Sequence, residues 1–165
     1  MHMLTPEESE RIEEYYRRYN VKLFRVAAAS FNNNRAMAED AVNQVFLVAC
    51  QNPQKLIEHP RPEAWLMTTL RYVIFHEKRY RARFQSLFIG ILPLVKQDSF
   101  ESKMKLDALY PGLTETPAFQ IIKWFAIDGY SVADIAEKLG ISINACKKRM
   151  ERARKTLSAM LKDKT

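Results

Sequence analysis

The sequence predicts an all-α protein made of two small helical domains. Apolar residues recur with the period of an α-helix over most of the chain, and glycine occurs only 4 times in 165 residues. Segments rich in strand-forming residues are scarce. With 47% hydrophobic residues, the chain can form packed cores and is too apolar to be disordered. Its length allows one ordinary domain or two small ones.

The first predicted helix begins after Thr5. Thr5 as N-cap, Pro6 at the first helical position and Glu8 at the third form a capping-box pattern. Acidic residues in the first turn also suit the positive end of the helix dipole. We expect this helix to end near Phe31, before the three asparagines at 32–34.

Two further helices should complete the first domain. The earlier one is expected at residues 35–51, and the later one at residues 63–83, after a loop at 52–62 that carries three prolines. Three helices of this size can close one small core. The expected inward residues are Met37, Ala41, Val45 and Val48 on the earlier helix, and Leu66, Leu70 and Val73 on the later one.

The connector that follows is unusually apolar in its first part, the stretch FQSLFIGILPLV at residues 84–95. Two interpretations are open. Either this stretch packs between the domains or onto an inhibitory partner, because an exposed apolar patch favours association, or the preceding helix continues and buries Leu87, Ile89 and Leu92 locally. The next stretch, at residues 101–110, has a helical pattern.

The last domain has the pattern of a helix-turn-helix. Helices are expected at residues 117–128, 131–139 and 142–161. Ser131 and Ser142 can cap the second and third of them, and Gly140 can end the second in a left-handed conformation. On the last helix, the expected inward stripe is Cys146, Met150, Ala153 and Leu157.

Positive charge is concentrated on that last helix. The formal net charge is +7, which favours a polyanionic partner but is equally compatible with a merely basic protein. From residue 142 onward there are eight basic and two acidic residues, so six of the seven excess charges lie there. The basic ones are Lys147, Lys148, Arg149, Arg152, Arg154, Lys155, Lys162 and Lys164. An apolar stripe opposite a basic face predicts a DNA-reading helix, although a solvated basic surface on an ordinary helical hairpin is the alternative.

Three segments resemble, in the same order, motifs of the bacterial RNA polymerase sigma factors, in particular the small two-domain extracytoplasmic-function group of the sigma-70 family. They are AEDAVNQVF at residues 38–46, AWLMTTLRYVIFHEKR at 64–79 and DGYSVADIAEKLGISINACKKRMERARKTL at 128–157. In that family the first segment binds core polymerase, the second recognises and melts the −10 element, and the third reads the −35 element. Tyr72 and Lys148 depart from the family pattern, which carries Asn and Ser there.

The resemblance implies two domains joined by a linker. Residues 1–83 would be a region 2-type domain, 84–103 a linker and 104–165 a region 4-type helix-turn-helix domain. Core polymerase would contact Glu39, Asp40, Asn43, Gln44 and Leu47. The −10 element would contact Leu56, Arg71, Tyr72, Phe75, His76, Arg79 and Arg83, unless Tyr72 and Phe75 are partly buried in the core. The −35 element would contact Asn144, Lys147, Lys148, Arg149, Glu151, Arg152, Arg154 and Lys155.

The implied function is a sigma factor that binds core RNA polymerase and directs transcription initiation. Its expected partners are the polymerase, double-stranded promoter DNA, the melted −10 strand and an anti-sigma factor, and the free protein is expected to be a monomer. Two alternatives are a stand-alone helix-turn-helix regulator, which would bind a palindromic site as a dimer, and an interaction protein that holds polymerase or an anti-sigma factor without opening promoters.

Other classes of function find no support in the sequence. We see no catalytic set, phosphate loop or metal-ligand spacing, so neither an enzyme nor a cofactor or metal protein is expected. Cys50 and Cys146 stand alone and suggest a reducing compartment. The start has no apolar signal region, and the longest apolar run, at 87–95, is far shorter than the roughly 20 residues that span a bilayer. We therefore expect a cytoplasmic protein without membrane insertion.

Overall fold

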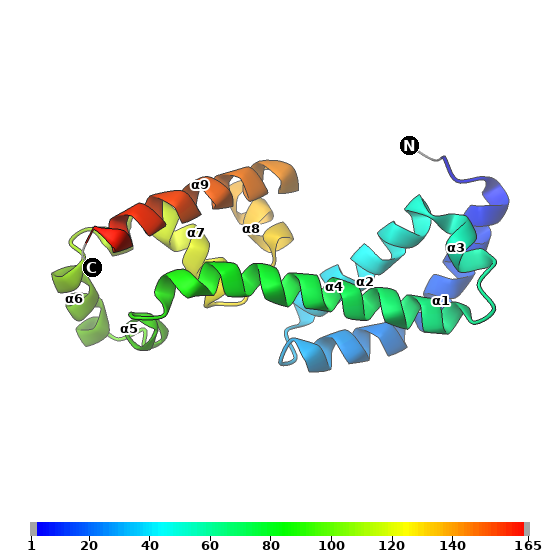
Figure 1. Ribbon diagram of the computed structural model, residues 1–165, viewed down its shortest axis with the longest axis horizontal. Helices are drawn as coiled ribbons and strands as arrows, with labels where there is room; N and C mark the ends of the chain where they lie inside the picture. The colour runs from blue at the N-terminus through cyan, green and yellow to red at the C-terminus, as the bar shows by residue number, and fades with distance from the viewer. Residues whose placement is uncertain (1–2, 164–165) are drawn as a thin grey trace. The chain divides into compact units, whose positions relative to one another are not determined.

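The computed structural model describes residues 3–163, and all regular structure within that range is helical (Figure 1). The expectation of an all-α fold is confirmed. The elements, in order, are α1 (Pro6–Ser30), α2 (Arg35–Gln51), α3 (Pro53–Ile57), α4 (Pro62–Gln85), the 3-10 helix η1 (Ser86–Phe88), α5 (Leu92–Lys96), α6 (Phe100–Leu109), the 3-10 helix η2 (Leu113–Glu115), α7 (Pro117–Ala126), α8 (Val132–Leu139) and α9 (Ile143–Lys162).

The chain forms two compact units that divide between Lys78 and Arg79, inside α4. The first unit contains α1, α2, α3 and most of α4. The second contains the last turns of α4 and everything after them. This division differs from the expected one, because residues 84–103 are part of the second unit rather than a separate linker.

Local sequence signals set the boundaries of the first two helices. Glu8 accepts a hydrogen bond from the Thr5 N–H at 2.8 Å, and Thr5 Oγ1 accepts one from the Glu8 N–H at 3.2 Å, which confirms the predicted capping box. After α1, Asn32 and Asn33 take left-handed conformations with φ of 53° and 61°. Asparagine tolerates this region better than most residues, so the polar triplet makes a tight turn between α1 and α2.

The first unit buries one apolar core between its helices. Leu66 and Leu70 of α4 are fully buried, as expected, but the next inward residue is Ile74, while Val73 is only partly buried. The loop expected before α4 contains the short helix α3, which starts at Pro53. Its Leu56 is fully buried in the same core.

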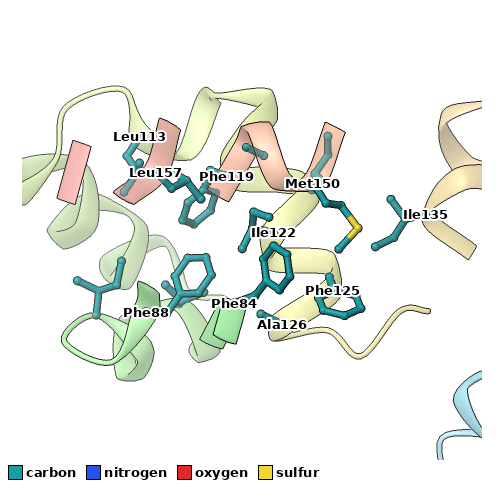
Figure 2. Packing of buried hydrophobic residues seen from close by; sticks show 14 of the residues in the cluster. Phe84, Phe88, Leu113, Phe119, Ile122, Phe125, Ala126, Ile135, Met150 and Leu157 are labelled. Carbon is teal, nitrogen blue, oxygen red and sulfur yellow. The ribbon is translucent and has the colours of Figure 1, made fainter. Parts of the chain in front are cut away.

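The apolar connector belongs to the core of the second unit. Phe84, Phe88, Ile91 and Val95, spaced by four, three and four residues, are at most 5% exposed. Figure 2 shows Phe84 and Phe88 among side chains of α7 and α9. The ring centroids of Phe84 and Phe125 are 5.3 Å apart. The second of the two interpretations, local burial, therefore holds for this stretch. The buried residues, however, differ from those expected. Leu87 and Leu92 are partly buried, whereas Ile89 is 75% exposed.

Two polar side chains at the end of α4 complete the attachment of this segment to α7. Arg81 donates hydrogen bonds to the carbonyl oxygens of Phe125 and of Tyr130, the latter at 3.0 Å, and its guanidinium carbon lies 4.1 Å from the centre of the Phe125 ring. Gln85 donates to the Ala126 carbonyl at 2.8 Å. These donors satisfy carbonyl groups at and just after the C-terminal end of α7, which otherwise lack partners within the helix.

Candidate nucleic-acid interface

The helix-turn-helix of the second unit is formed by α8 and α9 (Figure 1). Ser131 caps α8 in a reciprocal capping box with Asp134. Gly140 ends α8 with a left-handed φ of 63°, and Ser142 accepts a hydrogen bond from the Ala145 N–H at 3.1 Å to cap α9. Both caps and the glycine turn are confirmed as predicted from the sequence.

One side of α9 is buried and the other is basic. The predicted inward stripe of Cys146, Met150, Ala153 and Leu157 is at most 5% exposed. Burial raises the pKa of the Cys146 thiol, although the Arg149 charge partly opposes this effect. The stripe fixes which side of the helix faces outward. Asn144, Lys147, Lys148, Arg149, Arg152 and Lys155 are exposed, and Glu151 and Arg154 are half-buried.

The outward side of α9 carries a shallow hollow lined by Lys147, Lys148, Glu151 and Arg152. Among residues 3–163, no carboxylate forms an ion pair with Lys147, Lys148 or Lys155. These ammonium groups are therefore available to an external anion. Lys164, counted above with the basic residues of the tail, lies outside the described residues.

Glu151 is the one acidic side chain within this basic surface. Its Oε2 atom accepts a hydrogen bond from Arg154 Nε at 3.2 Å, three residues later on α9. The same atom accepts a second one from Arg83 Nη2 at 3.3 Å. Arg83 comes from the end of α4, 68 residues earlier in the sequence. No local pattern connects the two residues, and sequence reasoning missed their contact.

A group of exposed aromatic side chains lies on the part of α4 that belongs to the first unit. Tyr72 is 65% exposed and Phe75 is 59% exposed. The His76 ring contacts both: its centroid is 4.2 Å from that of Tyr72 and 5.7 Å from that of Phe75. The alternative of burial in the core is therefore wrong for these two residues. Arg71 and His76 are exposed as well.

The other three members of the expected −10 group are one buried residue and two arginines nearer the end of α4. Leu56 is fully buried in the core of the first unit, so its side chain cannot line a pocket for a base, and this expectation is corrected. Arg79 and Arg83 are exposed on α4 but fall on the second-unit side of the division.

The outward side of α2 is polar around a single exposed leucine. Asn43, Gln44 and Glu39 are exposed, Asp40 is half-buried, and Leu47 is 50% exposed. Glu39 also forms an ion pair with Arg35 at 2.8 Å. Next to this surface, Tyr16 of α1 packs edge-on against Phe46 with ring centroids 4.9 Å apart. The five residues expected to face polymerase thus form a largely accessible strip along one helix.

Two other kinds of site find no support in the described part of the chain. Residues 3–163 contain no group of three or more His, Cys, Asp and Glu side chains placed to hold a metal ion. No helix in that range is both long enough and apolar enough to cross a bilayer.

Comparison with known proteins gives matches to two models of one family. The model for sigma-70 region 2 matches residues 15–84, and the model for sigma-70 region 4 matches residues 117–157. Together they cover more than half of the chain. The region 4 match contains the helix-turn-helix, and the region 2 match contains the exposed sides of α2 and α4.

Similar full-length proteins agree with these matches. The chain is 28% identical over 144 residues to the ECF RNA polymerase sigma factor SigL of Mycobacterium tuberculosis, in strains Erdman, CDC 1551 and H37Rv. The alignment covers 82% of this chain and 81% of each relative. No solved structure matches the chain significantly. With region 2 and region 4 present in order on an all-helical fold, the chain belongs to the sigma-70 family and is an extracytoplasmic-function sigma factor.

Proposed function

We propose that this chain performs the role of a sigma factor through three surfaces, one on each of α2, α4 and α9. As a sigma factor, it binds core RNA polymerase and directs promoter recognition and transcription initiation. Sigma factors are non-enzymatic initiation factors. The region 2 match over residues 15–84 argues against a stand-alone helix-turn-helix regulator, because such a regulator has no need of that domain.

The −35 element is proposed to bind the outward side of α9. The observation that carries this proposal is the combination of a buried apolar stripe with an opposite basic surface on a capped helix. Residues near the start of such a helix can reach base edges in the major groove, while later cations contact phosphates. We assign Asn144, Lys147 and Lys148 to base contacts, and Arg149, Arg152, Arg154 and Lys155 to phosphate contacts.

The −10 element is proposed to bind the exposed aromatic group of α4. Unstacked bases can stack on Tyr72, Phe75 and His76, each stack contributing about 1–3 kcal/mol. Arg71 and Arg79, on the same helix, would contact the sugar-phosphate backbone. Capture of unpaired bases stabilises the open strand without any chemical step.

Core polymerase is proposed to bind the outward side of α2. Leu47 offers exposed apolar area at the C-terminal end of this surface, and the side chains of Glu39, Asp40, Asn43 and Gln44, which precede it on the helix, offer hydrogen-bonding groups. Protein interfaces commonly combine exposed apolar side chains with such polar ones.

The first test is gel filtration of the full chain with core polymerase that lacks any sigma factor. The wild-type chain should co-elute with the polymerase, and the double variant Gln44→Ala/Leu47→Ala should co-elute much less. Gln51→Ala is the matched control, because Gln51 is exposed on the same helix but lies outside the proposed surface. Failure of the wild-type chain to co-elute, together with tight binding to duplex DNA, would contradict the proposed function.

The same proposal includes the oligomeric state of the protein, its cellular location and a further partner. Free chain should elute as a monomer in that experiment, and a sigma factor works in the cytoplasm, where the polymerase is. An anti-sigma factor is proposed as a further partner, since extracytoplasmic-function sigma factors usually have one.

A further inference from the structure

Polar contacts attach the end of α4 to α7 and α9 within the second unit. Arg83 Nη2 donates a hydrogen bond to Glu151 Oε2 of α9 at 3.3 Å. Gln85 Nε2 donates one to the Ala126 carbonyl at the end of α7, at 2.8 Å. Arg81 donates two more, to carbonyl oxygens at and just after the end of α7. The last turn of α4 is therefore bound to two helices of the domain that carries the helix-turn-helix.

Four apolar side chains continue this attachment beyond α4. Phe84, Phe88, Ile91 and Val95 are at most 5% exposed in the core of the second unit. Figure 2 shows the first two among side chains of α7 and α9. The 3-10 helix η1 packs against α9 as well. We call residues 81–95 the attached segment, because its polar and its apolar contacts both hold it against the helix-turn-helix domain.

The attachment limits how far apart α4 and α9 can act. Because α4 is one helix, the stretch from Tyr72 to Arg83 spans about 16 Å, at 1.5 Å per residue. On α9, Lys147 precedes Glu151 by about one turn, or about 6 Å. Along α4, across the contact of Arg83 with Glu151 and along α9, the path from the aromatic group to the base-reading residues is therefore shorter than roughly 40 Å.

The two promoter elements are further apart than this. They are named for their distances from the transcription start, so their centres lie about 25 base pairs apart, or roughly 85 Å of straight duplex at about 3.4 Å per base pair. While the attached segment stays in place, the chain can therefore occupy one element but not both.

Release of the attached segment would supply the missing reach. Residues 86–99, between α4 and α6, span up to about 45 Å when extended, which is about the length required. Release also exposes apolar side chains that the core now buries, and this opposes it. A partner shifts such an equilibrium only if it binds the released form more tightly. Core polymerase holds the chain while both promoter elements are bound, so it is the partner expected to do so.

We propose that the attached segment is an autoinhibitory contact of the free protein, and that binding of core polymerase releases it. In the closed state, the −10 and −35 surfaces are too close together to bind one promoter at the same time. The inference rests on the proposed function and goes beyond it, because it makes polymerase a requirement for promoter recognition by this chain as well as for RNA synthesis.

A cross-link between η1 and α9 tests whether the segment is released. Ser86 is exposed in η1, and Ser158 follows Glu151 by two helical turns, so it lies on the same side of α9. In a Cys50→Ser background, the double variant Ser86→Cys/Ser158→Cys provides two thiols for a cleavable bismaleimide. Cys146 is buried and should react slowly. The free chain should cross-link in high yield, and the yield should fall several-fold in the complex with core polymerase.

The cross-linked chain provides a second readout, because shielding of the thiols by polymerase would also lower the yield. The template carries a promoter that the wild-type holoenzyme has selected from a random-sequence library. The cross-linked chain should fail to initiate from it, and a thiol reductant, which cleaves the linker, should restore initiation. Each single-cysteine chain treated with the same reagent is the matched control and should initiate normally. Circular dichroism establishes that every variant is folded.

The outcomes separate this inference from the function on which it rests. Either an unchanged yield in the polymerase complex or normal initiation by the cross-linked chain would overturn the inference alone. So would a low yield in the free chain, because the segment would then not be attached in solution. If the wild-type chain neither co-eluted with core polymerase nor supported initiation, the proposed function would be wrong, and the inference with it.

Discussion

Substitution of Phe88 by alanine tests whether the apolar connector is a structural part of the helix-turn-helix unit. Phe88 is fully buried and packs edge-on against Phe119, with ring centroids 5.8 Å apart. Its neighbour Ile89 is 75% exposed. If the connector were an unstructured tether, alanine substitution of either residue would have the same small effect on stability. In the packed unit, only the substitution of Ile89 should be tolerated.

The expected destabilisation follows from the burial of the ring. Truncation of a fully buried Phe to Ala removes its apolar surface from the core and leaves a cavity, at a combined cost of about 3–5 kcal/mol. With a urea m-value of about 1.5 kcal/mol/M, the unfolding midpoint of the second unit should fall by about 2–3 M. Ile89→Ala should change the free energy of unfolding by no more than about 0.5 kcal/mol.

The two tryptophans allow this unit to be followed alone. Trp65 lies in the first unit and Trp124 in the second. In a Trp65→Phe background, fluorescence during urea denaturation therefore reports only on the unit that contains the connector. Phe88→Leu keeps part of the packing and should unfold between the wild-type chain and Phe88→Ala, in case the alanine variant does not fold. Equal midpoints for Phe88→Ala and Ile89→Ala would refute the reasoning.

Two further predictions concern the burial of Cys146 and the part that the connector plays in the second unit. Iodoacetamide should alkylate the half-buried Cys50 well before Cys146, because burial shields the Cys146 thiol and raises its pKa, so that less of the reactive thiolate forms at neutral pH. Peptide mass spectrometry measures the two alkylation rates. Equal rates in the native protein would contradict the burial of the apolar stripe on α9. A fragment of residues 79–163 should unfold cooperatively in urea, whereas one of residues 104–163 should not, since it lacks four core side chains; cooperative unfolding of the shorter fragment would show that the connector is dispensable.

The helix boundaries and the apolar stripe of α9 could be predicted because their causes are local. A cap and its partner are three residues apart, as with Ser131 and Asp134, and Gly140 marks the end of α8 by its own backbone preference. The stripe from Cys146 to Leu157 follows from helical periodicity alone. Patterns that lie within a few turns of one helix are visible in the sequence without knowledge of the fold.

Contacts between distant segments could not be predicted in this way. Leu56 was expected in the −10 surface from the resemblance, but α3 places its side chain in the core of the first unit. The connector's inward residues could not be chosen without knowing where α7 and α9 lie. The contact between Arg83 and Glu151, 68 residues apart, has no signal in either local sequence.

The hydrogen bonds of Arg81 have a consequence for recombination between sigma factors. Arg81 is 7% exposed, and its guanidinium donates hydrogen bonds to the carbonyl groups of Phe125 and Tyr130. A chimera that joined residues 1–103 of this chain to the helix-turn-helix of another family member would bury the same cation against an unmatched loop. Loss of a hydrogen bond from a charged donor of this kind destabilises a protein by about 1.5–3 kcal/mol. An exchange of promoter specificity should therefore transfer the segment from residue 79 onward as one block.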